Sequence, residues 1–284
     1  MKTLTIGSCL SNLTVTWLKM DYGFDQTHNV QHMRSDAFVT YYVERTAKMI
    51  PLDFMNSYLK GSERWATEAQ KYLLNQYRET LGFHELLDSK DPDTDFFQDI
   101  QSQKVDVIVM DNFMDVAAQL MRPKNWSEWR NSPLFLNPHF YANQDEICRD
   151  FEFTGHITPE DSAACWLKIY RFIRKLQPAA KMFFLSFMYA TSTDSAERYH
   201  RAREFYLNFS QLARGEDLFL VPPLDLPLEL HIPGDWSHVD GHVYRALAGY
   251  IYLHSVAGMP RPEDLHRSAP TAMSPNAELV AAGN

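Results

Sequence analysis

The sequence predicts an α/β fold in which helices cover both faces of a parallel β-sheet. Short apolar runs alternate with longer segments of helical spacing, and such alternation is typical of parallel sheets. The run at 105–110 (Val-Asp-Val-Ile-Val-Met) has the β-branched character of a strand buried on both faces. With 284 residues, 45% of them hydrophobic, the chain can bury one large core.

The predicted elements follow one another along the chain. Strands are expected over 2–6, 105–110, 181–188 and 218–221, and the first is followed directly by a helix on which Leu10, Leu13, Trp17 and Leu18 recur. Another helix is predicted over 63–81. Thr158 is expected to cap a helix that starts at Pro159 and runs to about residue 177. The last helices are predicted over 195–214 and 243–256.

Three stretches lack such a pattern. Residues 22–60 are expected to form loops and short helices. Residues 122–156 are rich in Trp, Pro, Asn and His and are predicted to be a long inserted loop or lid over a pocket. The chain after Gly258 has the composition of a flexible tail. We therefore predict one catalytic domain over 1–257 and a flexible tail over 258–284.

Composition argues against several classes of partner. The net charge is −9 without a long Lys/Arg block, which disfavours nucleic acid. The N-terminal apolar run is too short for a signal peptide, and no stretch approaches the roughly 18 apolar residues of a membrane span. The three cysteines and eleven histidines lack the spacing of a disulfide framework or a metal site. We expect a cytoplasmic protein without a metal, in which Cys9 is a free thiol.

The first candidate site is the turn Gly7-Ser8-Cys9 after the first strand. A helix that begins here directs its free N–H groups and its dipole at the same space as these side chains, which can lower the pKa of a thiol and stabilise an oxyanion. The alternative is that Gly7 only makes a turn, Ser8 caps the helix and Cys9 is buried.

The second candidate is Asp235 with His238 near the C-terminus. An aspartate three residues before a histidine can accept the Nδ1–H of the imidazole and leave Nε2 free to take a proton from a nucleophile. The alternative is that Asp235 caps a turn and His238 is a surface residue. Ligands of parallel sheets bind beyond the carboxyl ends of the strands, and both candidates follow predicted strands.

Together the two blocks resemble the SGNH, or GDSL-type, hydrolase superfamily. The resemblance implies a flavodoxin-like three-layer α/β/α fold, with His238 as the base, Asp235 as its orienting partner and His242 as a fallback. If the glycine of the family's Gly-Asp-Ser block is aligned with Gly7, the nucleophile is Cys9. If the serine of that block is aligned with Ser8, the nucleophile is Ser8. The register of the whole block favours Cys9. A Gly-x-Cys block is also similar to that of WcbI-like capsule-biosynthesis proteins, which are regarded as acetyltransferases that bind coenzyme A.

The resemblance further implies residues for the oxyanion and the substrate. Asn112 is the candidate side-chain donor, and the alternative is that Asp111 or Asn112 caps a helix. Gly61 or Ser35 stands for the glycine of the family's second block. Arg122 and Lys124 could contact the phosphates of coenzyme A.

The implied activity is acyl transfer, with an acetyl group as the expected acyl, to a carbohydrate hydroxyl in polysaccharide biosynthesis. It proceeds through a covalent acyl-enzyme, needs no cofactor for the chemistry and has acetyl-CoA as a possible donor. The alternatives are a carbohydrate esterase of the same fold and a non-catalytic scaffold that binds a glycan or a protein.

Overall fold

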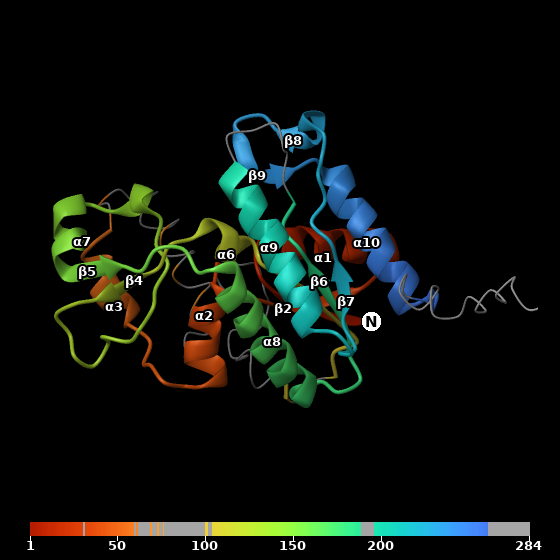
Figure 1. Cartoon of the computed structure of the whole chain (residues 1–284), viewed down its shortest axis with the longest axis horizontal. Coiled ribbons are helices and arrows are strands. Elements are labelled where there is room, and N and C mark those ends of the chain that lie inside the picture. The colour runs from red at the N-terminus through yellow and green to blue at the C-terminus, as the bar shows by residue number, and fades with distance from the viewer. Residues whose placement is uncertain are drawn as a thin grey trace, which may run out of the picture.

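The molecule is built around a five-stranded parallel sheet (Figure 1). The computed structural model describes residues 1–30, 32–59, 61, 69, 73, 76, 100–101, 104–188 and 196–260. The strands lie in the order β2 (Asp25–Val30), β1 (Lys2–Ile6), β3 (Val107–Asp111), β6 (Lys181–Leu185) and β7 (Phe219–Val221), and each neighbouring pair is parallel. Counted along the chain, this is the order 2-1-3-4-5 of flavodoxin-like sheets. The predicted fold class is confirmed.

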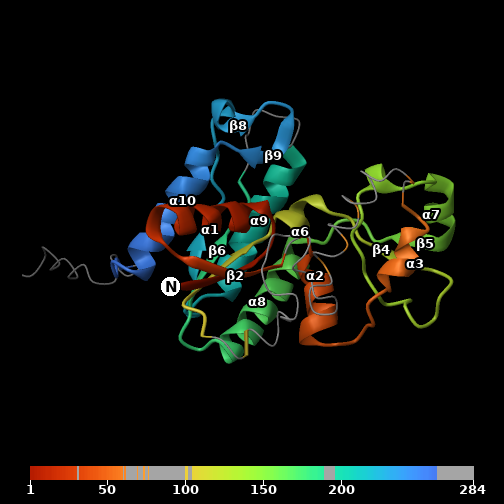
Figure 2. The ribbon, with the colours of Figure 1, turned by 180° about the vertical axis from the view of Figure 1, so that it is seen from behind.

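Helices cover both faces of the sheet, which gives three layers (Figures 1 and 2). Alternate side chains of a strand point to opposite faces. Val107 and Val109 pack with α1 (Cys9–Tyr22) and α10 (Gly241–Ser255). Ile108 and Met110 pack on the other face, with the helices α2 (Ser35–Phe38), α8 (Pro159–Leu176) and α9 (Ala196–Leu212). Each face thus has its own buried core.

The two helices with clear start signals begin where the sequence places them. The Thr158 hydroxyl accepts the N–H of Asp161, and Pro159 opens α8. Ser8 is the N-cap of α1 and accepts the N–H of Leu10. Gly23 ends α1 in the left-handed conformation, with φ of 71°, which glycine adopts without a steric penalty.

A second lobe with its own core lies beside the sheet domain (Figure 1). It contains α3 (Leu52–Asn56), the short helix η3 (Pro138–Phe140), α7 (Gln144–Asp150) and the antiparallel pair β4 (Met121–Pro123) and β5 (Phe151–Phe153). The stretch 122–156, predicted to be a long inserted loop or lid over a pocket, thus contains regular elements, and some of its residues line the main cavity. Its aromatic residues are packed: the ring of Phe54 contacts those of Trp126 and Trp129, with centroids 4.7 and 4.9 Å away.

Other differences arise where the sequence is polar. β2 was not predicted, because five of its six residues are polar and only backbone pairing with β1 identifies it. Asp235 and His238 lie on a short strand that was not predicted, β9 (Asp235–Val239), which pairs with β8 (His231–Ile232). The predicted helix at 63–81 and the tail at 258–284 fall mostly outside the described residues.

Two smaller elements complete the part that positions the site. The short helix α6 (Phe113–Ala117) follows β3, and the π-helical turn η1 (Val39–Val43) extends α2. Among the described residues, no helix is both long and apolar enough to cross a membrane.

Candidate active site

A cavity of about 520 Å³ opens beyond the carboxyl ends of the central strands. It is bordered by the start of α1, by α6, by the start of α9, by β9 and by parts of the second lobe. The described residues that line it include Ser8, Cys9, His32, Phe113, Phe135, Asn137, Phe153, His156, Glu197, Arg198, Arg201, Ser237 and His238. The two candidate blocks, more than 220 residues apart in the sequence, therefore meet at one cavity.

Asp235 and His238 form the hydrogen-bonded pair that their spacing predicts. The Nδ1–H of His238 donates to Oδ2 of Asp235 over 2.6 Å. With Nδ1 held in this way, Nε2 is the ring nitrogen left to exchange a proton with a ligand. The imidazole is about one-third exposed and lines the cavity, so a nucleophile in the cavity can reach it. The fallback residue His242 is exposed and is not among the lining residues.

Ser237 is a third member of this group that the sequence did not single out. Its N–H and its hydroxyl both donate to Oδ1 of Asp235, over 2.9 and 2.5 Å, and the hydroxyl lies 3.1 Å from Nδ1 of His238. Burial by itself raises the pKa of Asp235, but the hydrogen bonds from Ser237 and His238 outweigh it and hold this pKa below its usual value. Asp235 is thus kept ionised opposite the imidazole.

The first turn of α1 is bound to the end of β3 by Asp111. Its Oδ2 accepts the N–H groups of Ser8 and Ser11 over 2.7 and 2.9 Å, and its Oδ1 accepts the Ser8 hydroxyl over 2.8 Å. The Ser8 oxygen in turn accepts the N–H of Leu10. Ser8 is only 2% exposed, and its hydroxyl is occupied by this network. The Ser8 hydroxyl is therefore engaged in hydrogen bonds that hold the start of α1 against the end of β3.

The thiol of Cys9 does not have the lowered pKa expected of a helix N-terminus. Burial, followed by the negative charges of Asp111 and Asp235, raises its pKa to about 11. The Asp111 carboxylate lies on the N–H groups that would otherwise favour a thiolate, so the expected dipole effect is cancelled. That expectation was wrong, and Cys9 rests as a neutral thiol that needs a base.

Cys9 and His238 line the same cavity. Within the described part of the chain, no hydrogen bond joins Sγ of Cys9 to the imidazole. Catalytic hydrogen bonds are often long or absent until a substrate is bound, so the lack of this bond is compatible with proton transfer in a complex.

Asn112, the candidate oxyanion donor, faces away from this space. Its side-chain oxygen accepts the N–H of Phe187 over 2.8 Å, which joins the ends of β3 and β6. Its Nδ2 is buried and has no hydrogen-bond partner among the described residues, and Asn112 borders a separate small pocket instead of the main cavity. Its role at an oxyanion stays a prediction that this geometry does not favour.

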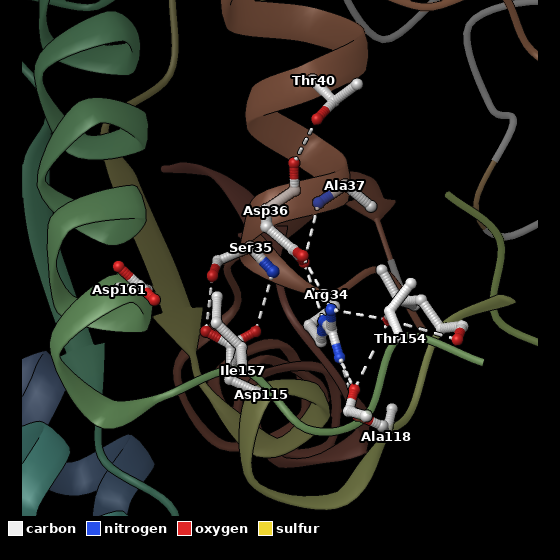
Figure 3. Close-up of polar contacts among 12 residues, drawn as sticks. Arg34, Ser35, Asp36, Ala37, Thr40, Asp115, Ala118, Thr154, Ile157 and Asp161 are labelled. Carbon is white, nitrogen blue, oxygen red and sulfur yellow. Dashed lines mark hydrogen bonds and ion pairs between the residues drawn. The ribbon is translucent and has the colours of Figure 1, made fainter. Parts of the chain in front are cut away.

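Ser35 and Gly61 do not reach the cavity, which corrects both assignments. The N–H and hydroxyl of Ser35 donate to Asp115 over 2.7 and 2.5 Å (Figure 3). Asp115 is fully buried and also accepts the Ser162 hydroxyl and the Trp166 indole N–H. Gly61 is exposed after the second lobe's Leu59 and is not among the lining residues.

Arg122 and Lys124 are likewise not among the lining residues. Arg122 lies on β4 in the second lobe, where its Nε is buried and has no hydrogen-bond partner in the part of the chain that the structure describes. The Lys124 ammonium donates to the carbonyl oxygen of Cys148 over 2.6 Å. Their assignment to the phosphates of coenzyme A in this cavity is therefore wrong.

Other lining residues were missed because sequence patterns give no signal for them. His32 follows β2 and has a φ of 58°, a conformation that is uncommon outside glycine. His156, Arg198 and Arg201 also line the cavity. The described residues bring together no group of three or more His, Cys, Asp or Glu that could hold a metal ion.

No protein-family model matches the sequence, and no curated protein matches it. Among solved structures, the chain is similar to a GDSL-like lipase from Bacteroides thetaiotaomicron, with a TM-score of 0.43 and 9% identity over 91% of this chain and 89% of that one. The chain is also similar to a carbohydrate acetylesterase from Sinorhizobium meliloti, with a TM-score of 0.42 and 10% identity over 91% of this chain and 99% of that one.

An acetyl xylan esterase from Butyrivibrio proteoclasticus gives a TM-score of 0.41 and 12% identity, over 90% of this chain and 64% of that one. The chain therefore spans less than two thirds of that protein. At TM-scores below 0.5, these likenesses carry no weight for function, which has to be argued from the residues of the site.

Proposed function

We propose that this chain is an SGNH-like enzyme that cleaves acyl esters through a covalent intermediate on Cys9. The observation that carries the proposal is the meeting of Cys9 and the Asp235–His238 pair at one cavity. A hydrogen-bonded acid–imidazole pair that lines the same cavity as a nucleophile at a strand-to-helix turn is the arrangement that acyl transfer requires.

The reaction has two steps. Nε2 of His238 takes the proton of the Cys9 thiol, and the sulfur attacks the carbonyl carbon of the ester. The imidazolium, stabilised by Asp235, returns the proton to the alcohol that leaves. In the second step, water or an acceptor hydroxyl gives its proton to His238 and attacks the carbonyl carbon of the thioester. The carbon–sulfur bond breaks, the imidazolium returns the proton to Sγ of Cys9, and the product is an acid or a new ester.

The resting thiol pKa of about 11 makes the base essential. At neutral pH very little of Cys9 is ionised, so the thiolate forms only as His238 accepts its proton. The Cys9 N–H supports the negative oxygen of the intermediate, because the neighbouring N–H groups of Ser8, Leu10 and Ser11 already donate to Asp111 or Ser8.

The resemblance of the sequence blocks favours a carbohydrate ester or hydroxyl as the substrate and an acetyl group as the acyl. Hydrolysis is the simpler version of the reaction, because neither Arg122 nor Lys124 lines the cavity to receive coenzyme A. Acetyl transfer to a carbohydrate from acetyl-CoA is the second version, and it differs only in the donor and in the acceptor of the second step.

The test compares four variants on 4-nitrophenyl acetate. Cys9→Ala and His238→Ala are expected to lose at least about 100-fold in kcat/KM, the range for a lost nucleophile or general base. Cys148→Ala, which removes an exposed cysteine of α7, is the matched control and is expected to change nothing. Ser8→Ala is expected to lower the melting temperature while the folded fraction still reacts.

Mass spectrometry of the intact protein, mixed with the ester or with acetyl-CoA, distinguishes the versions. An acetyl group found on Cys9 after reaction with the ester supports hydrolysis. An acetyl group that Cys9 takes from acetyl-CoA and passes to a sugar supports transfer. If Cys9→Ala and His238→Ala retain full activity, or the adduct maps to Ser8, the assignment of Cys9 is wrong. Absence of all acyl chemistry in the wild type would leave a binding scaffold.

A further inference from the structure

The second lobe contributes one exposed aromatic ring to the cavity. Phe153 is the last residue of β5, is 38% exposed, and lines the cavity together with Cys9 and His238. Phe151, two residues before it, belongs to the same face of the strand but is buried in the core of the lobe. The aromatic face of β5 therefore runs from the lobe core to the cavity.

The ring of Phe153 has surface left for a ligand. Its centroid lies 6.4 Å from that of Tyr141, near the outer limit of an aromatic pair. The rest of its exposed surface borders a cavity in which a small molecule can cover it. A ligand that removes this apolar surface from water gains the free energy of its burial.

Arg34 fixes the chain on both sides of the β4–β5 pair (Figure 3). Its side chain is 3% exposed and donates to both carboxylate oxygens of Asp36, over 2.8 and 2.7 Å. Nη1 donates to the carbonyl oxygens of Ala118, before β4, and of Gly155, after β5, over 3.2 and 2.7 Å. One buried guanidinium thus holds the chain two residues from Phe153, so the ring is preorganised beside the cavity.

Two uncharged amide side chains line the same cavity. Gln119 and Asn137 are both exposed. Oδ1 of Asn137 accepts the N–H of His139 over 3.0 Å, which orients the amide and leaves its NH₂ group as a donor. An amide offers donors and an acceptor without a charge, and this combination matches hydroxyl groups, which also donate and accept.

The imidazole of His156 is a third uncharged group in the cavity. Partial burial, followed by the positive charge of Arg201, lowers its pKa below the usual value. At neutral pH the ring is therefore neutral, and a neutral imidazole has one donor and one acceptor nitrogen. This wall of the cavity suits a ligand that is rich in hydroxyls.

We propose that Phe153 binds the sugar ring of the substrate by stacking while the ester lies at Cys9. Gln119 and Asn137 bind the hydroxyls at the edge of that ring. A pyranose presents C–H groups on its face and hydroxyls on its rim, so an aromatic ring covers the first and amides bind the second. The cavity of about 520 Å³ has the size of a small-ligand site.

The inference rests on the proposed esterase function and names the part of the molecule that selects its substrate. The sheet domain supplies the nucleophile and the base, and the second lobe supplies the surface that recognises the sugar. Loss of the lobe's ring should therefore change which ester is cleaved and leave the chemical step intact.

The first experiment compares two uncharged acetate esters, ethyl acetate and the mixed mono-O-acetyl isomers of methyl glucoside, by titration of the acid released. The wild type is expected to prefer the sugar ester by at least about tenfold in kcat/KM, the effect of one aromatic stacking interaction. Most of the preference is expected in KM, because the ring contacts the sugar equally before and during the reaction. Equal or better cleavage of ethyl acetate contradicts the proposal.

Substitutions of Phe153 test the ring itself. In Phe153→Ala the ratio of sugar ester to ethyl acetate in kcat/KM is expected to fall toward one, with ethyl acetate cleaved as by the wild type. Phe153→Trp keeps a flat aromatic face and should retain the ratio, whereas Phe153→Leu keeps only apolar area and should lose it. Tyr22→Ala is the matched control, because Tyr22 is 37% exposed and is not among the lining residues. An unchanged ratio in Phe153→Ala refutes the proposal.

Gln119→Ala tests the edge of the sugar ring independently of the aromatic face. The same ratio is expected to fall by about three- to tenfold, the effect of one hydrogen bond to a hydroxyl. Because the ratio is taken within one variant, any general loss of activity cancels. An unchanged ratio would overturn the assignment of this amide.

An acyl chain is the other part of an ester that an aromatic ring can cover. Comparison of ethyl butyrate with ethyl acetate distinguishes the two occupants. If the sugar stacks on Phe153, Phe153→Ala leaves the butyrate-to-acetate ratio unchanged. A fall in that ratio, together with an unchanged sugar preference, would place the acyl chain on the ring and overturn the proposal.

A binding measurement separates this inference from the proposed function. Saturation-transfer NMR of Cys9→Ala with methyl glucoside needs no catalysis, and the signal is expected to disappear when Phe153→Ala is added. Such a signal, together with a wild type that cleaves no ester, would refute the esterase and leave the sugar site standing. Ester cleavage without sugar preference, together with no signal, would refute the sugar site alone.

Discussion

The carboxylate of Asp111 lies directly against the α-carbon of Gly7. A methyl group on Gly7 would lie 2.3 Å from Oδ2 of Asp111, far inside van der Waals contact. The same oxygen accepts the Ser8 and Ser11 N–H groups, so it cannot move away without breaking them. The glycine is what allows the end of β3 to cap α1 and thereby to position Cys9.

Gly7→Ala is accordingly expected to destabilise the protein by about 1–3 kcal/mol, the usual cost of overpacking a filled site. Urea unfolding followed by circular dichroism measures this. Gly61→Ala is the matched control, because no described atom lies within 4 Å of a methyl group there. Equal stability of Gly7→Ala and wild type would show that the contact with Asp111 is not rigid.

The reactivity of Cys9 should report its burial and the negative charges around it. With a pKa raised to about 11, its alkylation by iodoacetamide is expected to rise about tenfold per pH unit between about pH 8 and 10, without a plateau. Peptide mass spectrometry after timed quenching gives the rate, and the exposed Cys148 serves as the internal standard. If the alkylation rate instead levels off near neutral pH, the N-terminus of α1 does stabilise the thiolate of Cys9.

Removal of the Ser237 hydroxyl should shift the acid side of the activity profile. The hydrogen bonds of Asp235 hold its pKa below the unfolded value, so its contribution to stability is present above that value and is lost as the pH falls through the folded pKa. Ser237→Ala removes a 2.5 Å bond and raises this pKa, so the loss begins at a higher pH.

We expect Ser237→Ala to lower kcat/KM by about three- to tenfold near neutrality, the effect of one hydrogen bond. Measurement of kcat/KM as a function of pH checks both the magnitude and the shift. Ser237→Thr, which retains a hydroxyl, is expected to keep the wild-type profile. An unchanged acid limb in Ser237→Ala would mean that the bond to Asp235 is dispensable.

The buried acceptor Asp115 should matter more for folding than for chemistry. Asp115→Ala would leave the donors of Ser35, Ser162 and Trp166 buried without an acceptor, at a cost of at least about 3 kcal/mol. Thermal and urea unfolding measure the loss, with Asp53→Ala at an exposed position as the control. A loss below 1 kcal/mol, about that of one hydrogen bond, would show that these donors find other partners.

Local patterns in the sequence were enough to predict most of the sheet and one half of the site. The β-branched run at β3, the cap at Thr158 and the hydrogen bond between Asp235 and His238 each depend on residues only a few positions apart. The residue pattern that favours each of these features lies within one short segment, so the sequence alone is enough to predict it.

Only the tertiary structure decided the remainder. Asp111 caps α1 across 103 residues, and Arg201 is fixed by the carbonyls of Asp115 and Ile157, 86 and 44 residues away. β2 became a strand by pairing with β1 despite its polar sequence, and the second lobe formed by packing distant aromatic rings. Contacts of this kind depend on how folding brings distant segments of the chain together, and no local propensity encodes that arrangement.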